Sequence, residues 1–183
     1  MHWFDTMNEK KILLIGDSIT WSFDTPKLLP EFDIINKGIP ANNTAHLLKR
    51  LKRDLLASNP NIVFILIGTN DIAQGCDDSE ISSNIRSILL LTFENVQVKD
   101  IFITSVLPTR NNHLRPNERI RELNEKIQII ASEFKVNYLN LYPLFADETD
   151  QLIVDMTEDG LHLNEKAYAI WAEFLRQLLN DKL

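Results

Sequence analysis

Short apolar runs alternate with stretches of helical periodicity along the whole chain. The runs "KILLIGDS" and "NIVFILIGTN" are apolar almost throughout, which is typical of strands buried on both faces of a parallel sheet. The runs "DIINKGI", "DIFITSVL" and "VNYLNLY" are bounded by polar or Pro- and Asn-containing segments. They are predicted as three further strands.

Four amphipathic helices are predicted in the segments that follow these runs. Residues 42–44 are candidate caps for the first helix, Ser79 precedes the second, Pro116 suits the first turn of the third, and the last begins near Asn164. The predicted apolar faces are Leu48, Leu51 and Leu55; Ile81, Ile85 and Ile88; Ile120, Leu123, Ile127 and Ile130; and Ala167, Trp171, Phe174 and Leu178.

This alternation predicts an α/β fold, because parallel strands joined by right-handed crossovers need helices to cover both faces of the sheet. We expect a three-layer α/β/α sandwich around a doubly wound, flavodoxin-like sheet of five parallel strands. The length of 183 residues fits a single domain spanning residues 1–183, with residues 1–9 as a peripheral segment. Functional sites in such folds gather at the carboxyl edge of the sheet.

Composition narrows the functional classes. The net charge of −7 argues against a nucleic-acid partner, because phosphate binding needs clustered Lys and Arg. Cys76 is the only cysteine, so no intrachain disulfide can form, which fits a reducing compartment and a cytoplasmic location. No apolar run approaches the length of a membrane span.

Polar residues follow the predicted strands at the edge where a site is expected. The candidates are Gly16, Asp17 and Ser18; Asn36, Lys37 and Gly38; Gly68, Thr69, Asn70 and Asp71; and Asp159 and His162, which lie before the last helix. They bring a hydroxyl, a glycine amide, a side-chain amide, carboxylates and an imidazole to one edge of the sheet.

This set of groups is what acyl transfer requires. A serine such as Ser18 becomes nucleophilic when an imidazole accepts its proton, and His162 is the candidate base. Asp159 can orient that imidazole. The N–H groups of Ser18 and Gly38 and the amide of Asn70 are candidate donors to the oxyanion.

The blocks "GDSIT", "NKGI", "GTND" and "DGLH" resemble, in order, those of the SGNH hydrolases, also called the GDSL-like lipase/acylhydrolase family. The resemblance implies a triad of Ser18, Asp159 and His162 and an oxyanion hole of Ser18, Gly38 and Asn70. Two positions depart from the family pattern: Ile follows Ser18 where the name-giving motif has Leu, and Ala41 stands where many relatives carry a second glycine. The second departure puts the shape of the cleft in doubt.

The sequence leaves other interpretations of these residues open. Asp17, Asp71, Asp159 and His162 could ligate a metal in a phosphohydrolase, and a non-catalytic phospho-receiver or carbohydrate-binding module is a further alternative. The segment "KRLKR" at 49–53 and the cluster Arg110, His113, Arg115, Arg119 and Arg121 are interpreted first as solvated surface. Trp21 and Phe23 could line a pocket or belong to the core.

The preferred hypothesis is a serine esterase that uses neither metal nor organic cofactor. Its expected substrates are small-molecule esters with short acyl chains, with O-acetylated carbohydrates among the candidates, since no lid-like apolar insertion is visible.

Overall fold

The computed structural model describes residues 10–95 and 100–182, so the predicted peripheral segment 1–9 lies outside the described residues. Its sheet has five parallel strands in the order β2-β1-β3-β4-β5. The strands are β1 (Ile12–Gly16), β2 (Ile34–Gly38), β3 (Ile62–Leu66), β4 (Asp100–Thr104) and β5 (Asn137–Leu139). The predicted fold class is confirmed, although β5 is shorter than its run "VNYLNLY" because the chain turns into a helix at Tyr142.

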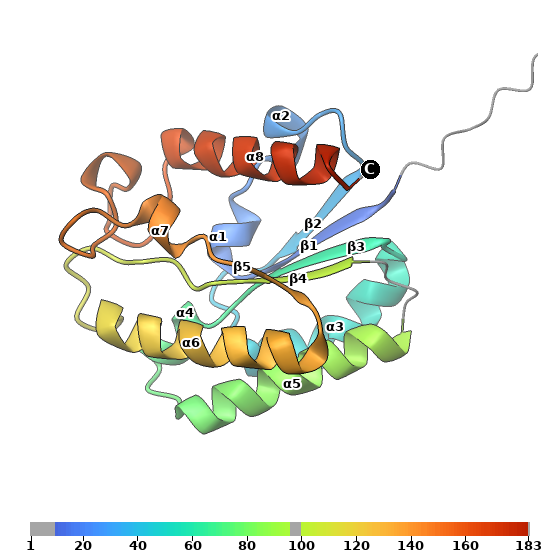
Figure 1. Ribbon diagram of the computed structural model, residues 1–183, viewed down its shortest axis with the longest axis horizontal. Helices are drawn as coiled ribbons and strands as arrows, with labels where there is room; N and C mark the ends of the chain where they lie inside the picture. Colours follow the sequence, from blue (N-terminus) through green and yellow to red (C-terminus); the bar gives the residue numbers. More distant parts are fainter. Residues whose placement is uncertain (1–9, 96–99, 183) are drawn as a thin grey trace, which may run out of the picture.

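Helices cover both faces of the sheet (Figure 1). One face carries α3 (Thr44–Ser58), α5 (Asp78–Asn95) and α6 (Asn117–Phe134), and the other carries α8 (Glu165–Asn180). The short elements are α1 (Ser18–Trp21), α2 (Thr25–Leu28), α4 (Thr69–Ala73), α7 (Tyr142–Phe145) and the 3₁₀ turn η1 (Val154–Met156).

Strands β1 and β3 are apolar at every position because their successive side chains enter opposite layers. Leu13 and Ile15 of β1 belong to the core beneath α3, α5 and α6, while Ile12 and Leu14 belong to the core beneath α8. All four side chains are buried. A continuous apolar run is therefore the sequence form of a strand with two covered faces.

Two predicted helix faces are confirmed in part: Leu51 and Leu55 of α3 and Ala167 and Trp171 of α8 are buried, but their other predicted positions are off by one residue. In α3 the fully buried residue is Leu47, whereas Leu48 is only partly buried; in α8 Leu175 and Leu179 are buried in place of Phe174 and Leu178. Each pair of neighbours is apolar, so the periodicity alone does not choose between them. The faces predicted for α5 and α6 are confirmed, but Pro116 is the N-cap of α6 and not its first helical residue.

The strand order places a topological switch point beside β1. The chain passes from β1 to β2 on one side and then crosses to β3 on the other, so β1 lies between β2 and β3. The loops that leave β1 and β3 diverge at this point. In open α/β sheets, sites usually lie at the carboxyl ends of the strands beside such a switch point.

Candidate active site

Ser18 and Asn70 lie at the carboxyl ends of the two strands that flank the switch point. Ser18 is the first residue of α1, directly after β1, and Asn70 lies in the first turn of α4, after β3. Asp159 and His162 come from the loop between η1 and α8. The strand-end rule therefore located Ser18 and Asn70 correctly from the sequence.

Local hydrogen bonds explain how Ser18 is presented. Asp17 is the N-cap of α1, and its Oδ1 accepts the N–H of Ile19 at 2.9 Å. From α8, the hydroxyl of Tyr168 donates to the carbonyl of Ile19 at 2.8 Å and holds the short helix in place. An N–H in the first turn of a helix has no intrahelical acceptor, so the Ser18 amide is available to a ligand.

Ser18, His162 and Asp159 form a continuous chain of contacts. The Oγ of Ser18 lies 3.0 Å from Nε2 of His162, and Nδ1 of His162 lies 2.6 Å from Oδ2 of Asp159. The other oxygen of Asp159 accepts the backbone N–H groups of Leu161 and His162, at 2.9 and 2.8 Å. The carboxylate thus fixes both the ring of His162 and the turn that carries it.

The environment of Asp159 favours its ionised form. Burial opposes ionisation, but the hydrogen bonds from the His162 ring and from the N–H groups of His162 and Leu161 outweigh it and lower the pKa of Asp159 to about 2. An ionised carboxylate at Nδ1 keeps the proton on that nitrogen and leaves Nε2 as the acceptor that faces Ser18.

The loop that carries Asp159 is tied to the loop after β4. Gly160 has φ +78° and accepts the N–H of Arg110 on its carbonyl at 2.8 Å. A Cβ at Gly160 would lie 2.2 Å from the carbonyl oxygen of Arg110, so a larger residue cannot occupy this position without displacing the strand-end loop. Glycine is required here by both conformation and space.

The amide of Asn70 has two partners and is nearly buried. Its Nδ2 donates to the carbonyl of Asn42 at 2.9 Å, and its Oδ1 accepts from Nη2 of Arg115 at 3.0 Å. The side chain of Asn42 is itself held, because its Oδ1 accepts from Nε of Arg50 at 2.8 Å. One hydrogen on Nδ2 is not used by Asn42.

Gly38 serves packing in this structure. Its N–H donates to Oδ1 of Asn36 at 2.8 Å, and a Cβ at Gly38 would lie 2.1 Å from the backbone nitrogen of Trp21. The glycine thus allows β2 and α1 to approach closely, and its amide is engaged within its own segment. This contact does not support the predicted oxyanion role of Gly38. Nearby Ala41 has φ +61°, a left-handed conformation that favours glycine.

The acidic residues of the metal alternative do not converge. Asp71 accepts the N–H and the hydroxyl of Thr44, and Asp159 is bound by His162. Within residues 10–95 and 100–182, no group of three His, Cys, Asp or Glu side chains is arranged to hold a metal ion. The four ligands proposed for a phosphohydrolase therefore do not form one site.

Two basic segments are more than solvated surface. Arg50 is buried and donates to the carbonyl of Gly16 and to Asp54, and Arg115 reaches the amide of Asn70. The sequence interpretation was wrong for these two residues, because helical periodicity and loop composition do not reveal such contacts. Phe23 lies in the core, whereas Trp21 is 62% exposed.

A cavity of about 400 Å³ opens beside the imidazole of His162. Most of the residues that line it are polar or charged, and the full set is Ser22, Glu158, Asp159, His162, Leu163, Asn164, Glu165 and Tyr168. The side chains of His162 and Asp159 are 43% and 53% exposed, so the imidazole is accessible from solution.

The contacts that join Ser18, His162 and Asp159 at the carboxyl edge of a parallel sheet are an arrangement typical of several families of serine hydrolases. Comparison with known proteins identifies which one: the model of the GDSL-like Lipase/Acylhydrolase family matches residues 14–170. The chain belongs to this family.

Several relatives that align with this chain along most of their own length are named as esterases. An arylesterase of Vibrio mimicus is 27% identical, with 93% of this chain and 88% of that protein aligned. An isoamyl acetate-hydrolyzing esterase of Saccharomyces cerevisiae is 26% identical over 94% of this chain and 87% of its own length. The crystal structure of a GDSL-like lipase from Bacteroides thetaiotaomicron superposes with a TM-score of 0.85 at 26% identity, covering 96% and 90% of the two chains. In the described parts of this chain, no helix is both long and apolar enough to cross a membrane.

Proposed function

We propose that the protein hydrolyses small carboxylic esters through an acyl-enzyme on Ser18. The observation that carries the proposal is the unbroken chain of contacts from Ser18 through His162 to Asp159. A serine hydroxyl is a weak nucleophile until a neighbouring base accepts its proton, and a carboxylate at the far ring nitrogen stabilises the imidazolium that forms.

The reaction proceeds in two halves. Oγ of Ser18 attacks the ester carbonyl while Nε2 of His162 accepts the hydroxyl proton, giving a tetrahedral intermediate. Collapse breaks the bond to the alcohol, which leaves with the proton from His162. Water then attacks the acyl-enzyme with His162 again as the base, and the carboxylic acid is released as Ser18 regains its proton.

The negative charge of the tetrahedral intermediate needs fixed donors. The Ser18 N–H at the start of α1 and the second hydrogen on Nδ2 of Asn70 fill this role, since both flank the switch point and neither has an acceptor among the described residues. Gly38 is left out of this set because its N–H is bonded to Asn36.

The substrates we propose are esters of short acyl chains with small polar alcohols, O-acetylated carbohydrates among them. The cavity beside His162 is open, and most of the residues that line it are polar or charged, which suits a hydrated alcohol. The name of the yeast relative, an isoamyl acetate-hydrolyzing esterase, indicates an acetate ester as its substrate. A long acyl chain would need an extended apolar channel, and the cavity beside His162 has few apolar residues.

The test joins activity to covalent labelling of the nucleophile. Wild type should turn over p-nitrophenyl acetate, keep that activity in EDTA, and react with a fluorophosphonate probe at Ser18. Ser18→Ala should lose about 10⁴-fold in kcat and all labelling, because the covalent route is gone. Ser83→Ala, at an exposed position of α5, is the matched control. Retention of a tenth of the activity in purified Ser18→Ala would refute the assignment.

A panel of esters tests the substrate class. Under the proposal kcat/KM falls from acetate to butyrate to octanoate, and acetylated sugars are deacetylated. An octanoate ester turned over as efficiently as the acetate would contradict the short-chain proposal while leaving the nucleophile untouched.

A further inference from the structure

The side-chain amide of Asn70 lies between two partners of opposite hydrogen-bonding character. The guanidinium of Arg115 can only donate, and the carbonyl of Asn42 can only accept. Oδ1 of Asn70 accepts from the guanidinium of Arg115 at 3.0 Å, and Nδ2 donates to the carbonyl of Asn42 at 2.9 Å. A flipped amide would turn NH2 toward a donor and oxygen toward an acceptor, so only one orientation satisfies both contacts.

This orientation decides whether Asn70 can act as an oxyanion donor. Nδ2 carries two hydrogens, and one is bonded to the carbonyl of Asn42. The other is left for the developing negative charge. In the flipped state the oxygen of Asn70 would take the place of this donor, and it would repel the oxyanion that it should stabilise.

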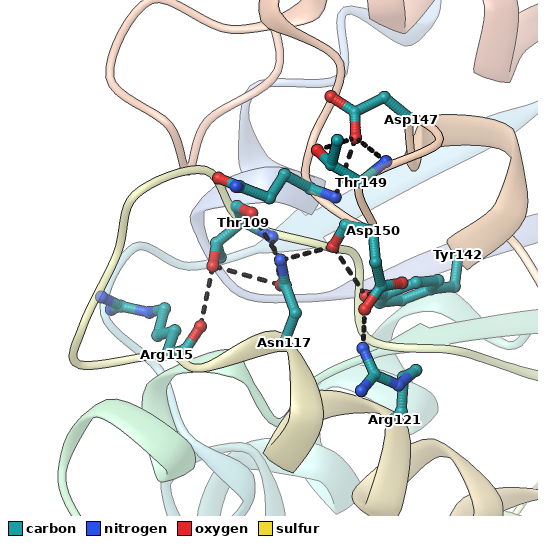
Figure 2. A network of polar contacts seen from close by, with 9 residues as sticks. Thr109, Arg115, Asn117, Arg121, Tyr142, Asp147, Thr149 and Asp150 are labelled. Atoms are coloured by element: carbon teal, nitrogen blue, oxygen red, sulfur yellow. Dashed lines mark hydrogen bonds and ion pairs between the residues drawn. The ribbon is translucent and has the colours of Figure 1, made fainter.

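Arg115 lies in a loop whose backbone is held by hydrogen bonds to neighbouring residues of the same segment. The carbonyl of Arg115 accepts the hydroxyl of Thr109 at 2.8 Å, and its N–H donates to the carbonyl of Asn112 at 3.1 Å. Asn117 bonds both the N–H and the carbonyl of Thr109, and its Nδ2 also donates to the carbonyl of Asp150. Figure 2 shows the guanidinium of Arg115 extending away from this network, which anchors only its backbone.

The positive charge of Arg115 also lies next to Asn70, the proposed oxyanion donor. Burial lowers the pKa of Arg115, and the carboxylates of Asp17 and Asp159 act in the opposite direction. A cation removed from bulk water interacts more strongly with nearby charge than a solvated one does.

The neighbouring arginines have other partners. Arg110 pairs with Asp147, Arg121 pairs with Asp150, and Arg119 donates to the carbonyls of Ile72 and Cys76. Among the described residues, Arg115 is the one arginine of these four that contacts a proposed oxyanion donor.

From these contacts we infer that Arg115 is a positioning residue for ester hydrolysis: it fixes the Asn70 amide with Nδ2 toward the oxyanion and adds positive charge behind it. The inference rests on the proposed function, since it assigns Arg115 a role in the same oxyanion hole. It goes beyond the triad because it predicts that the loop between β4 and α6 affects the rate of ester hydrolysis.

The first test separates rate from binding with the neutral substrate p-nitrophenyl acetate, which offers no anion for Arg115 to bind. Arg115→Met is expected to lower kcat about 10- to 100-fold with KM within about threefold, since the orientation of Asn70 matters mainly in the transition state. Arg115→Lys keeps a charged donor and should recover part of the loss. Arg121→Met removes one positive charge from nearby helix α6, where the arginine pairs with Asp150 and not with Asn70, and should keep wild-type kcat.

The second test asks whether Arg115 acts through Asn70. In an Asn70→Ala background, Arg115→Met should cost less than about threefold, because the amide that it positions is absent. An equal loss in both backgrounds would overturn the inference, and so would a raised KM with unchanged kcat. Melting temperatures of all variants are measured together, and recovery by Arg115→Lys is not expected if unfolding causes the loss.

Failure of the inference differs visibly from failure of the proposed function. If the function is wrong, wild type itself shows neither turnover nor labelling of Ser18 by fluorophosphonate. If only the inference is wrong, wild type is active and Arg115→Met is as active as Arg121→Met.

Discussion

Replacing Asp17 with Asn should change how the stability of the protein depends on pH. Asp17 is fully buried; Oδ1 accepts the N–H of Ile19, and Oδ2 has no hydrogen-bond partner among the described residues. Burial raises the pKa of this carboxyl from 3.8 to about 7, against the hydrogen bond from Ile19 and the charges of His162 and Arg115. Asn can still cap α1 through its side-chain oxygen.

The sign and size of the effect follow from proton linkage. Between pH 4 and 7 the folded protein holds a proton on Asp17 that the unfolded chain has released, so the folded state loses stability as pH rises through this window. A rise of about three units in pKa corresponds to about 4 kcal/mol at most, and relaxation around the charge makes about 2 kcal/mol a realistic lower figure. Above pH 7 the loss is complete.

The assay is urea unfolding of wild type and Asp17→Asn at pH 4.5 and pH 8. Subtracting the two proteins at each pH cancels the titration of all other groups. The stability of the variant relative to wild type should increase by about 2 to 3 kcal/mol between these pH values, because part of the full effect falls below pH 4.5. Asp24→Asn is the matched control, because Asp24 caps α2 in the same way but is exposed. A relative stability of Asp17→Asn that does not change with pH would refute the reasoning.

The remaining predictions concern the catalytic groups. His162→Ala should be nearly as damaging to kcat as Ser18→Ala, and the double variant should cost little more, because the residues act as a unit; additive losses would argue against a relay. Asp159→Asn should lower kcat about 10²- to 10⁴-fold by misorienting the imidazole, with the melting temperature measured to exclude unfolding. Asn70→Ala should lower kcat about 10²- to 10³-fold with little change in KM, and a rise in KM alone would assign it to substrate binding instead.

Local patterns in the sequence were sufficient for the architecture and for most candidate groups. A strand covered on both faces must be apolar at consecutive positions, as "KILLIG" is, and an amphipathic helix repeats its apolar residues every three or four positions. Parallel strands then bring Ser18 and Asn70 to one edge, and the last loop brings His162 there. These conclusions depend on spacing along the chain and on one rule of topology, which the sequence contains.

The tertiary structure decided the features that depend on contacts between distant segments. Arg115 lies 45 residues from Asn70, and its loop is placed by Thr109 and Asn117. No periodicity marks such a contact, so Arg115 resembled its solvated neighbours in sequence. Gly38 was assigned by its motif to the oxyanion hole, but its amide direction follows from the Asn36 side chain and the approach of α1. Hydrogen-bond direction is set by three-dimensional geometry, and a residue type alone does not specify it.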